Sequence, residues 1–148
     1  MSPFQEPREV PISEIDVLPA LDPPRDEVFS RLLERAARGE LDVFHGAVPL
    51  SLITPFSRVY DPSSHPAGEA AIQTVMDDWR RGSYQHMWVY PANDRYVMSD
   101  DYIVWMAAVR GQPELVPCWI LGQPTVPGVV GVQGPLEPGR VRQLLGLH

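Results

Sequence analysis

The chain has 148 residues and a formal net charge of −7, and all twelve of its cationic side chains are arginines. This acidic balance argues against a duplex-DNA binder, because neutralisation of phosphates supplies most non-specific affinity for DNA. A single cysteine excludes a disulfide framework and a cysteine-based zinc cluster, and with neither a signal-peptide pattern nor an apolar run of about 18 residues we expect a cytoplasmic protein without a membrane span.

The N-terminal region is punctuated by proline. Residues 1–24 form a proline-rich arm, in which the alternation at 10–18 predicts one short edge strand. A helix is predicted over 25–38, with Asp22 as its cap and Gly39 as its stop, because apolar residues recur there at a spacing of three to four.

The next region predicts an extended segment, a loop and a second helix. Residues 42–54 are predicted to be extended, with Gly46 and Pro49 as interruptions. Three prolines make 54–68 a loop, and a single apolar face predicts a helix over 66–81, ended by Gly82.

The central region predicts a β-hairpin. Residues 86–90 and 95–98 are the two strands, and the sequence PAND at 91–94 has turn chemistry. Ser99 or Asp100 is expected to cap a third helix, which leads into a last strand at 115–121.

The C-terminal region changes in composition after Gly122. Residues 123–148 are rich in proline and glycine, so we expect an arm with a short C-terminal helix, in which 128–134 is a flexible connection. Its amphipathic end, 140–147, is too short to be a stable helix alone and must dock on this domain, dock on a second subunit, or fray. The prediction is one α+β domain over 25–122, with a mixed sheet and three helices, between two arms.

Several segments follow one another in an order that is typical of a known family. They are VPLSLI at 48–53, the strand pair at 88–90 and 96–98, Asp100 followed by Ala107-Ala108, and VPCWIL at 116–121. In this pattern, residues 47–122 resemble the ParB/sulfiredoxin-like domain. The resemblance implies a small α+β fold in which a Gly-His-Arg-type turn at a helix start binds nucleotide phosphates.

The phosphate-binding turn is where this chain departs from the family. Asp101 falls on the family's glycine, Tyr102 on its histidine, and Ile103 and Val104 on its arginine positions. Glycine, cations and the helix dipole hold the anion in the family, whereas two carboxylates at the same helix start repel it. The sulfiredoxin branch also needs a cysteine in this turn, and the one cysteine here, Cys118, lies elsewhere.

Candidate site residues gather around the same turn. Asp100 and Asp101 are candidates for a general base or a magnesium ligand, although an N-cap followed by a first-turn acid is the simpler reading. His86 is a candidate acid or base if it points towards Asp100. The candidate ligand-binding residues are Ser99, Tyr102, Arg95 and Tyr90. Among the aromatic residues, Tyr90, Tyr96 and Tyr102 are expected to line a surface.

The four histidines show no helical metal spacing, and we expect neither a metal site nor a cofactor. The favoured function is a non-catalytic accessory or regulatory protein of the ParB/sulfiredoxin-like type, acting through a protein or a small ligand as a homodimer. The alternatives are a nucleotide-dependent or hydrolytic enzyme with a rebuilt pocket at the Asp100-Asp101-Tyr102 turn, and a nucleic-acid-associated protein.

Overall fold

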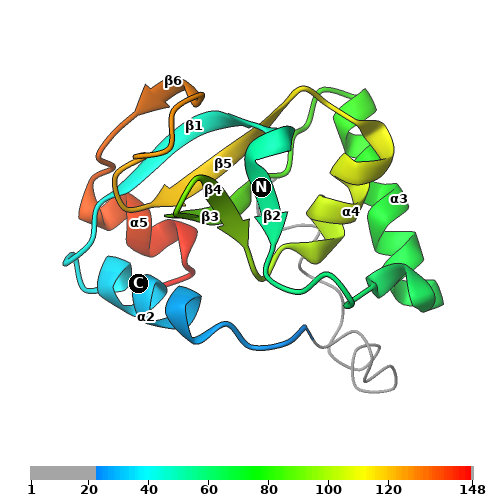
Figure 1. The fold of residues 1–148 in the computed structure, drawn as a ribbon, viewed down its shortest axis with the longest axis horizontal. Coiled ribbons are helices and arrows are strands. Elements are labelled where there is room, and N and C mark those ends of the chain that lie inside the picture. The colour runs from blue at the N-terminus through cyan, green and yellow to red at the C-terminus, as the bar shows by residue number, and fades with distance from the viewer. Residues whose placement is uncertain (1–22, 148) are drawn as a thin grey trace.

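Six strands form one mixed sheet in the computed structural model, which describes residues 23–147. They are β1 (Val43–Pro49), β2 (Ile53–Pro55), β3 (Met87–Ala92), β4 (Arg95–Met98), β5 (Leu115–Leu121) and β6 (Val130–Gln133). Their order across the sheet is β2-β4-β3-β5-β1-β6 (Figure 1). The pairs β2–β4 and β3–β5 are parallel, and the pairs β3–β4, β1–β5 and β1–β6 are antiparallel. The predicted arm over 1–24, including its edge strand, falls almost wholly outside the described residues.

Four α-helices accompany the sheet in the described part of the chain. They are α2 (Glu27–Ala37), α3 (Pro66–Arg80), α4 (Tyr102–Gly111) and α5 (Pro138–Leu144), and two short 3-10 turns are η3 (Leu50–Leu52) and η4 (Pro62–Ser64). The α+β class with a mixed sheet is confirmed. The predicted number of three helices is wrong, because α5 is a formed helix of the same body. No helix within 23–147 has both the length and the apolar character needed to cross a membrane.

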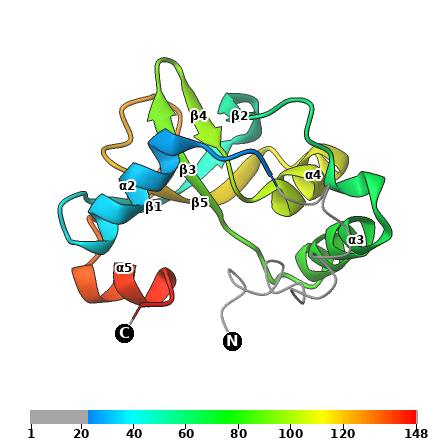
Figure 2. The same cartoon turned by 90° about the horizontal axis from the view of Figure 1, so that it is seen from below.

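The sheet is covered on both faces (Figure 2). The strand β5 shows how its residues divide: Cys118 and Ile120 belong to the core on the α4 side, whereas Trp119 and Leu121 belong to the core under α2 and α5. Strands that are buried on both sides are expected to be almost continuously apolar. This explains why the unbroken apolar run at 115–121 predicts β5 at its observed bounds.

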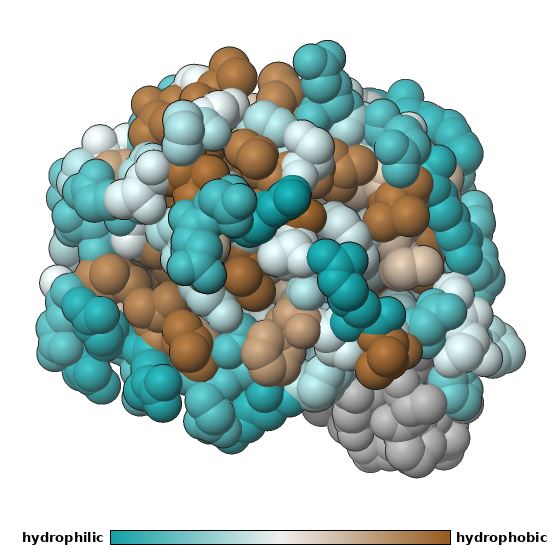
Figure 3. Space-filling model, in the orientation of Figure 1, coloured by the Kyte–Doolittle hydropathy of each residue, from teal (hydrophilic) through white to brown (hydrophobic). Residues whose placement is uncertain are grey.

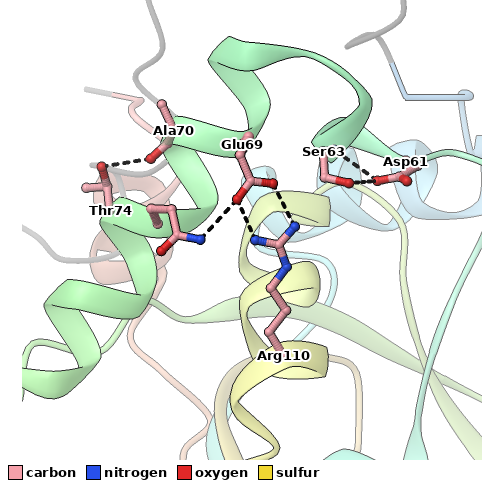
Figure 4. A network of polar contacts seen from close by, with 7 residues as sticks. Asp61, Ser63, Glu69, Ala70, Thr74 and Arg110 are labelled. Carbon is pink, nitrogen blue, oxygen red and sulfur yellow. Dashed lines mark hydrogen bonds and ion pairs between the residues drawn. The ribbon is translucent and has the colours of Figure 1, made fainter.

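The helix α3 packs on α4 through Ile72, Val75 and Ala107. A bidentate ion pair at their surface joins Arg110 of α4 to Glu69 of α3, with N–O distances of 2.6 and 2.7 Å (Figure 4). The hydrogen bonds from Arg110 and Gln73 lower the pKa of Glu69 to about 2. This exposed ion pair joins α3 to the helix that follows the candidate turn, beside the apolar packing of the two helices.

The start of α2 differs from the prediction. Asp26, and not Asp22, is the N-cap, and its Oδ1 accepts hydrogen bonds from the backbone N–H groups of Val28 and Phe29 at 3.0 and 3.3 Å. Both aspartates suit a cap by residue type. Asp26 has a further stabilising contact, because its second carboxylate oxygen accepts the Tyr90 hydroxyl from β3.

The predicted flexible connection at 128–134 is wrong, because this segment contains β6, which pairs with β1. The segment of β6 can approach β1 closely only because residue 46 is a glycine. A Cβ atom on Gly46 would lie 2.6 Å from Cγ1 of Val129. Backbone angles reserved largely for glycine occur at Gly131 (φ 67°) and Gly134 (φ 131°). The glycines that suggested a linker therefore allow an edge strand to fit closely.

The C-terminal helix docks on its own chain. Val141 and Leu144 of α5 are buried, and they share a core cluster with Phe29 and Ala36 of α2. The Arg142 guanidinium also donates to the carbonyl of Ala37 at 3.2 Å. Of the three alternatives for this tail, packing on the same domain is the one observed.

We expect Leu144→Ala to lower the free energy of unfolding by about 2 kcal/mol, because it removes buried apolar volume beneath a short helix. Urea unfolding measures this change. The control is Gln143→Ala, an exposed position on the same helix, for which a change below about 0.5 kcal/mol is expected. Equal effects of the two substitutions would show that α5 is not docked.

Candidate functional site

In the turn before α4, two side chains of the turn itself are buried. Ser99 and Asp101 are buried, with 4% and 2% of their surface exposed, whereas Asp100 is exposed. Oδ2 of Asp101 accepts a hydrogen bond from the backbone N–H of Trp88 in β3 at 2.8 Å. Asp101 thus joins the start of α4 to the sheet.

The predicted cap of α4 is wrong in detail. Asp101 occupies the N-cap position, rather than Ser99 or Asp100, and its side chain makes no capping hydrogen bond. The carboxylate instead accepts the backbone N–H of Trp88, the second residue of β3. A carboxylate at the N-cap need not face its own helix when a neighbouring strand offers a backbone N–H donor.

Tyr102 closes the other side of the turn. Its hydroxyl accepts a hydrogen bond from the backbone N–H of Ser57 at 2.9 Å, and its ring meets the edge of Tyr60 at a centroid distance of 4.7 Å. Burial raises the pKa of Tyr102. The side chain holds the loop after β2 against the start of α4.

The other predicted ligand-binding residues lie apart from this turn. Tyr90 donates its hydroxyl to Asp26 at 2.6 Å on the α2 side of the sheet, and burial together with this carboxylate raises its pKa. Arg95 is exposed and donates to the carbonyl of Ser51 at 2.6 Å. The structure therefore does not bring Tyr90 and Tyr102 together, since they belong to the cores on opposite faces of the sheet.

The expectation that three tyrosines line a surface is wrong. Tyr90, Tyr96 and Tyr102 expose 7%, 0% and 2% of their surfaces. Each hydroxyl has a partner within the chain, which for Tyr96 is the carbonyl of Val126 at 2.9 Å. Hydroxyls satisfied in this way let the aromatic rings contribute to the core without an unpaired polar atom.

His86 does not point into the turn. Its Nε2 atom lies 3.0 Å from Nε2 of His45 in β1, and its ring stacks on Trp119 at a centroid distance of 4.8 Å. The ring of His45 also meets Trp119, at 4.9 Å. Sequence spacing could not find this pair, because the two histidines are 41 residues apart and meet only through the order β3-β5-β1.

The environment of the pair disfavours the protonated form of both rings. Burial, the neighbouring His45 and the charge of Arg140 lower the pKa of His86 to about 4, against a weaker opposite effect of the Tyr84 backbone. Burial also lowers the pKa of His45. We call these two residues the histidine pair.

We expect His86 to make the fold acid-sensitive. Between about pH 6.5 and pH 4 the unfolded chain binds a proton on this histidine and the folded chain does not, so stability rises with pH across this window. Acidification from pH 7 to pH 4 should cost about 2–3 kcal/mol through His86. The measurement is urea unfolding at several pH values across this range.

The matched variants are His86→Gln, which should flatten this part of the pH profile, and His65→Gln, which should leave it unchanged. A His86→Gln profile with the slope of the wild type would contradict the assignment.

Two further features carry no chemistry of their own. Cys118 is fully buried, and burial raises the pKa of its thiol, so it is no ready nucleophile. A depression of about 430 Å³ lies beside the C-terminal half of α4. Its lining includes Leu50, Ser51, Trp105, Val109, Gln112 and Glu114. This depression contains none of the predicted site residues, and its one titratable lining residue is Glu114.

Comparison of the chain with protein-family models, with curated proteins and with solved structures gives no match. The fold stands as α+β with a mixed six-stranded sheet and four α-helices. The ParB/sulfiredoxin-like resemblance stays a prediction.

Proposed function

We propose that this chain is a non-catalytic accessory or regulatory protein of the ParB/sulfiredoxin-like type, which acts by binding a protein partner or a small ligand. One observation carries the proposal. The turn that would hold a phosphate in the family is occupied by the buried Asp101 carboxylate and the buried Tyr102 ring. An open polar cleft at this turn would have favoured the enzyme.

The electrostatics of the turn support the same conclusion. Asp100 and Asp101 bring two acidic side chains to the start of α4, and neither a glycine nor a cation of the family's motif is present there. A helix start binds phosphate through free N–H groups and a favourable field. A buried carboxylate at that place opposes a phosphate by charge as well as by volume.

The alternative of an enzyme with a rebuilt pocket receives less support. Asp101 is held by Trp88 and is 2% exposed, so it cannot reach an outside substrate without a rearrangement of the turn. His86, the proposed partner in acid–base chemistry, has its Nε2 directed at His45 of β1 and not at the turn. The three candidate catalytic groups therefore do not converge.

The test is calorimetry of the full chain with adenine and guanine nucleotides in the presence of Mg²⁺. We expect no heat of binding at micromolar to low millimolar ligand. Micromolar affinity for any of these nucleotides would overturn the proposal. The double change Asp101→Gly with Tyr102→His restores two residues of the family pattern, and a gain of nucleotide binding in it would tie the loss to this turn.

The edge of the sheet supports protein binding. The four residues of β6 are exposed, with Val130 and Val132 at 54% and 45%, and β6 ends the sheet. Apolar residues are exposed in several separate groups on the face shown in Figure 3. An edge strand offers backbone N–H and C=O groups to a further strand.

We expect a homodimer that uses this edge. Light scattering should then give twice the chain mass of 16.6 kDa. The substitution Val132→Lys should yield the monomer, whereas Val59→Lys, at an exposed position in a loop, should not. A wild-type monomer would remove the homodimer and leave the accessory function to be tested with other partners.

A further inference from the structure

The histidine pair is a built feature of the sheet that the proposed function does not use. His45 lies in β1, and His86 precedes β3, with β5 between these two strands. The outer two of three neighbouring strands are about 10 Å apart. Both imidazole rings contact the ring of Trp119 in β5. Their Nε2 atoms lie 3.0 Å from each other.

This separation lies within the range found for two imidazole nitrogens bound to one metal ion. Bonds of about 2.0–2.1 Å to one ion place two nitrogens roughly 2.9 Å apart at a right angle and about 3.4 Å apart at a tetrahedral angle. We propose that Nε2 of His45 and Nε2 of His86 form a binding site for a divalent transition metal ion, with Cu²⁺ preferred over Ni²⁺ and Zn²⁺. The order follows the general affinity of nitrogen ligands for these ions.

The surroundings suit a neutral imidazole ligand. Both rings have lowered pKa values, which favours the neutral form that binds a metal. The one Nε2–H of the metal-free contact moves to Nδ1 of the same ring when the ion binds. Nδ1 of His86 is buried, and Nε2 is the ring nitrogen that faces His45. The contacts with Trp119 fix the orientation of both rings before an ion arrives, which reduces the entropy lost on binding.

The site would be an open one. Within residues 23–147 no group of three or more His, Cys, Asp and Glu side chains is placed to hold a metal. Two imidazoles therefore leave the remaining coordination positions to water or to an outside ligand. Arg140 on α5 lowers the pKa of His86 and opposes any cation there, but its side chain is exposed and its charge is screened by solvent.

Without a metal, the same contact is one N–H···N hydrogen bond between two neutral rings. The proposal is independent of the ParB/sulfiredoxin-like assignment, because it rests on the β3-β5-β1 register alone. It departs from the expectation that the chain has no metal site, which was based on spacing along one helix.

The test is a titration of the full chain, treated first with EDTA and then dialysed, with CuCl₂ at pH 7. Quenching of tryptophan fluorescence reports binding next to Trp119. We expect saturation at one ion per chain, binding at least tenfold weaker in His45→Gln and in His86→Gln, and binding within twofold of wild type in His65→Gln. Arg140→Gln should bind a few-fold more tightly.

A second measurement does not depend on the variants. Pulsed electron paramagnetic resonance of the wild-type Cu²⁺ complex counts the coordinated imidazoles, and two are expected. One imidazole or none, or a titration in which His45→Gln and His86→Gln bind like the wild type, would overturn the proposal.

Discussion

Asp101→Ala is expected to lower the free energy of unfolding by about 2–4 kcal/mol. The substitution removes the carboxylate that accepts the backbone N–H of Trp88, and both groups are buried. Hydrogen bonds to charged groups contribute about 1.5–3 kcal/mol, and a buried donor left without an acceptor adds a desolvation cost. Urea unfolding followed by circular dichroism measures the change.

The neighbouring aspartate provides the control. Asp100 is exposed, so Asp100→Ala should change stability by about 0.5 kcal/mol or less. Asp101→Asn keeps an oxygen acceptor of the same size and should recover part of the loss. If Asp100→Ala and Asp101→Ala are equally mild, the carboxylate of Asp101 has no structural role and the catalytic alternative gains support.

Local patterns predicted most of the elements on which the turn is built. The second helix, the hairpin and the strand at 115–121 have strong signals within a dozen residues: a single apolar face, turn residues between two strands, and a continuous apolar run. The positive φ of Asn93 (59°) at the hairpin turn agrees with its residue type. The predicted turn at 91–94 is too long, because β3 continues through Pro91 to Ala92. For these elements, the local sequence was sufficient to predict the secondary structure.

Contacts between distant segments could not be predicted in the same way. The strand β6 has only four residues, and the glycines on both sides of it favour a loop prediction. It forms because β1 offers an edge and Gly46 offers room. The histidine pair depends on the register of β1 and β5, in which His45 lies opposite Trp119. Asp101 carries the same sequence signal as a cap, and only the position of Trp88 assigns its carboxylate to β3.

Asp26, like Asp101, is a buried carboxylate that joins a helix start to β3, and its substitution is expected to have the second large effect on the free energy of unfolding. Its Oδ1 caps α2, and its Oδ2 accepts the Tyr90 hydroxyl at 2.6 Å, while 5% of Asp26 and 7% of Tyr90 are exposed. A helix cap contributes about 1 kcal/mol and a buried charged hydrogen bond about 1.5–3 kcal/mol. Asp26→Ala should therefore lower the free energy of unfolding by about 3 kcal/mol.

A double-mutant cycle separates these two contributions. Tyr90→Phe removes only the hydroxyl and should cost about 1–2 kcal/mol, because it leaves Oδ2 of Asp26 without this donor. If the two groups act on each other, the double variant should be more stable than the sum of the single changes predicts, by about 1.5 kcal/mol. Tyr84→Phe, at an exposed position, should show no coupling to Asp26→Ala. Additive effects for Asp26 and Tyr90 would mean that α2 is held to the sheet by apolar packing alone, and that Asp26 acts only as a cap.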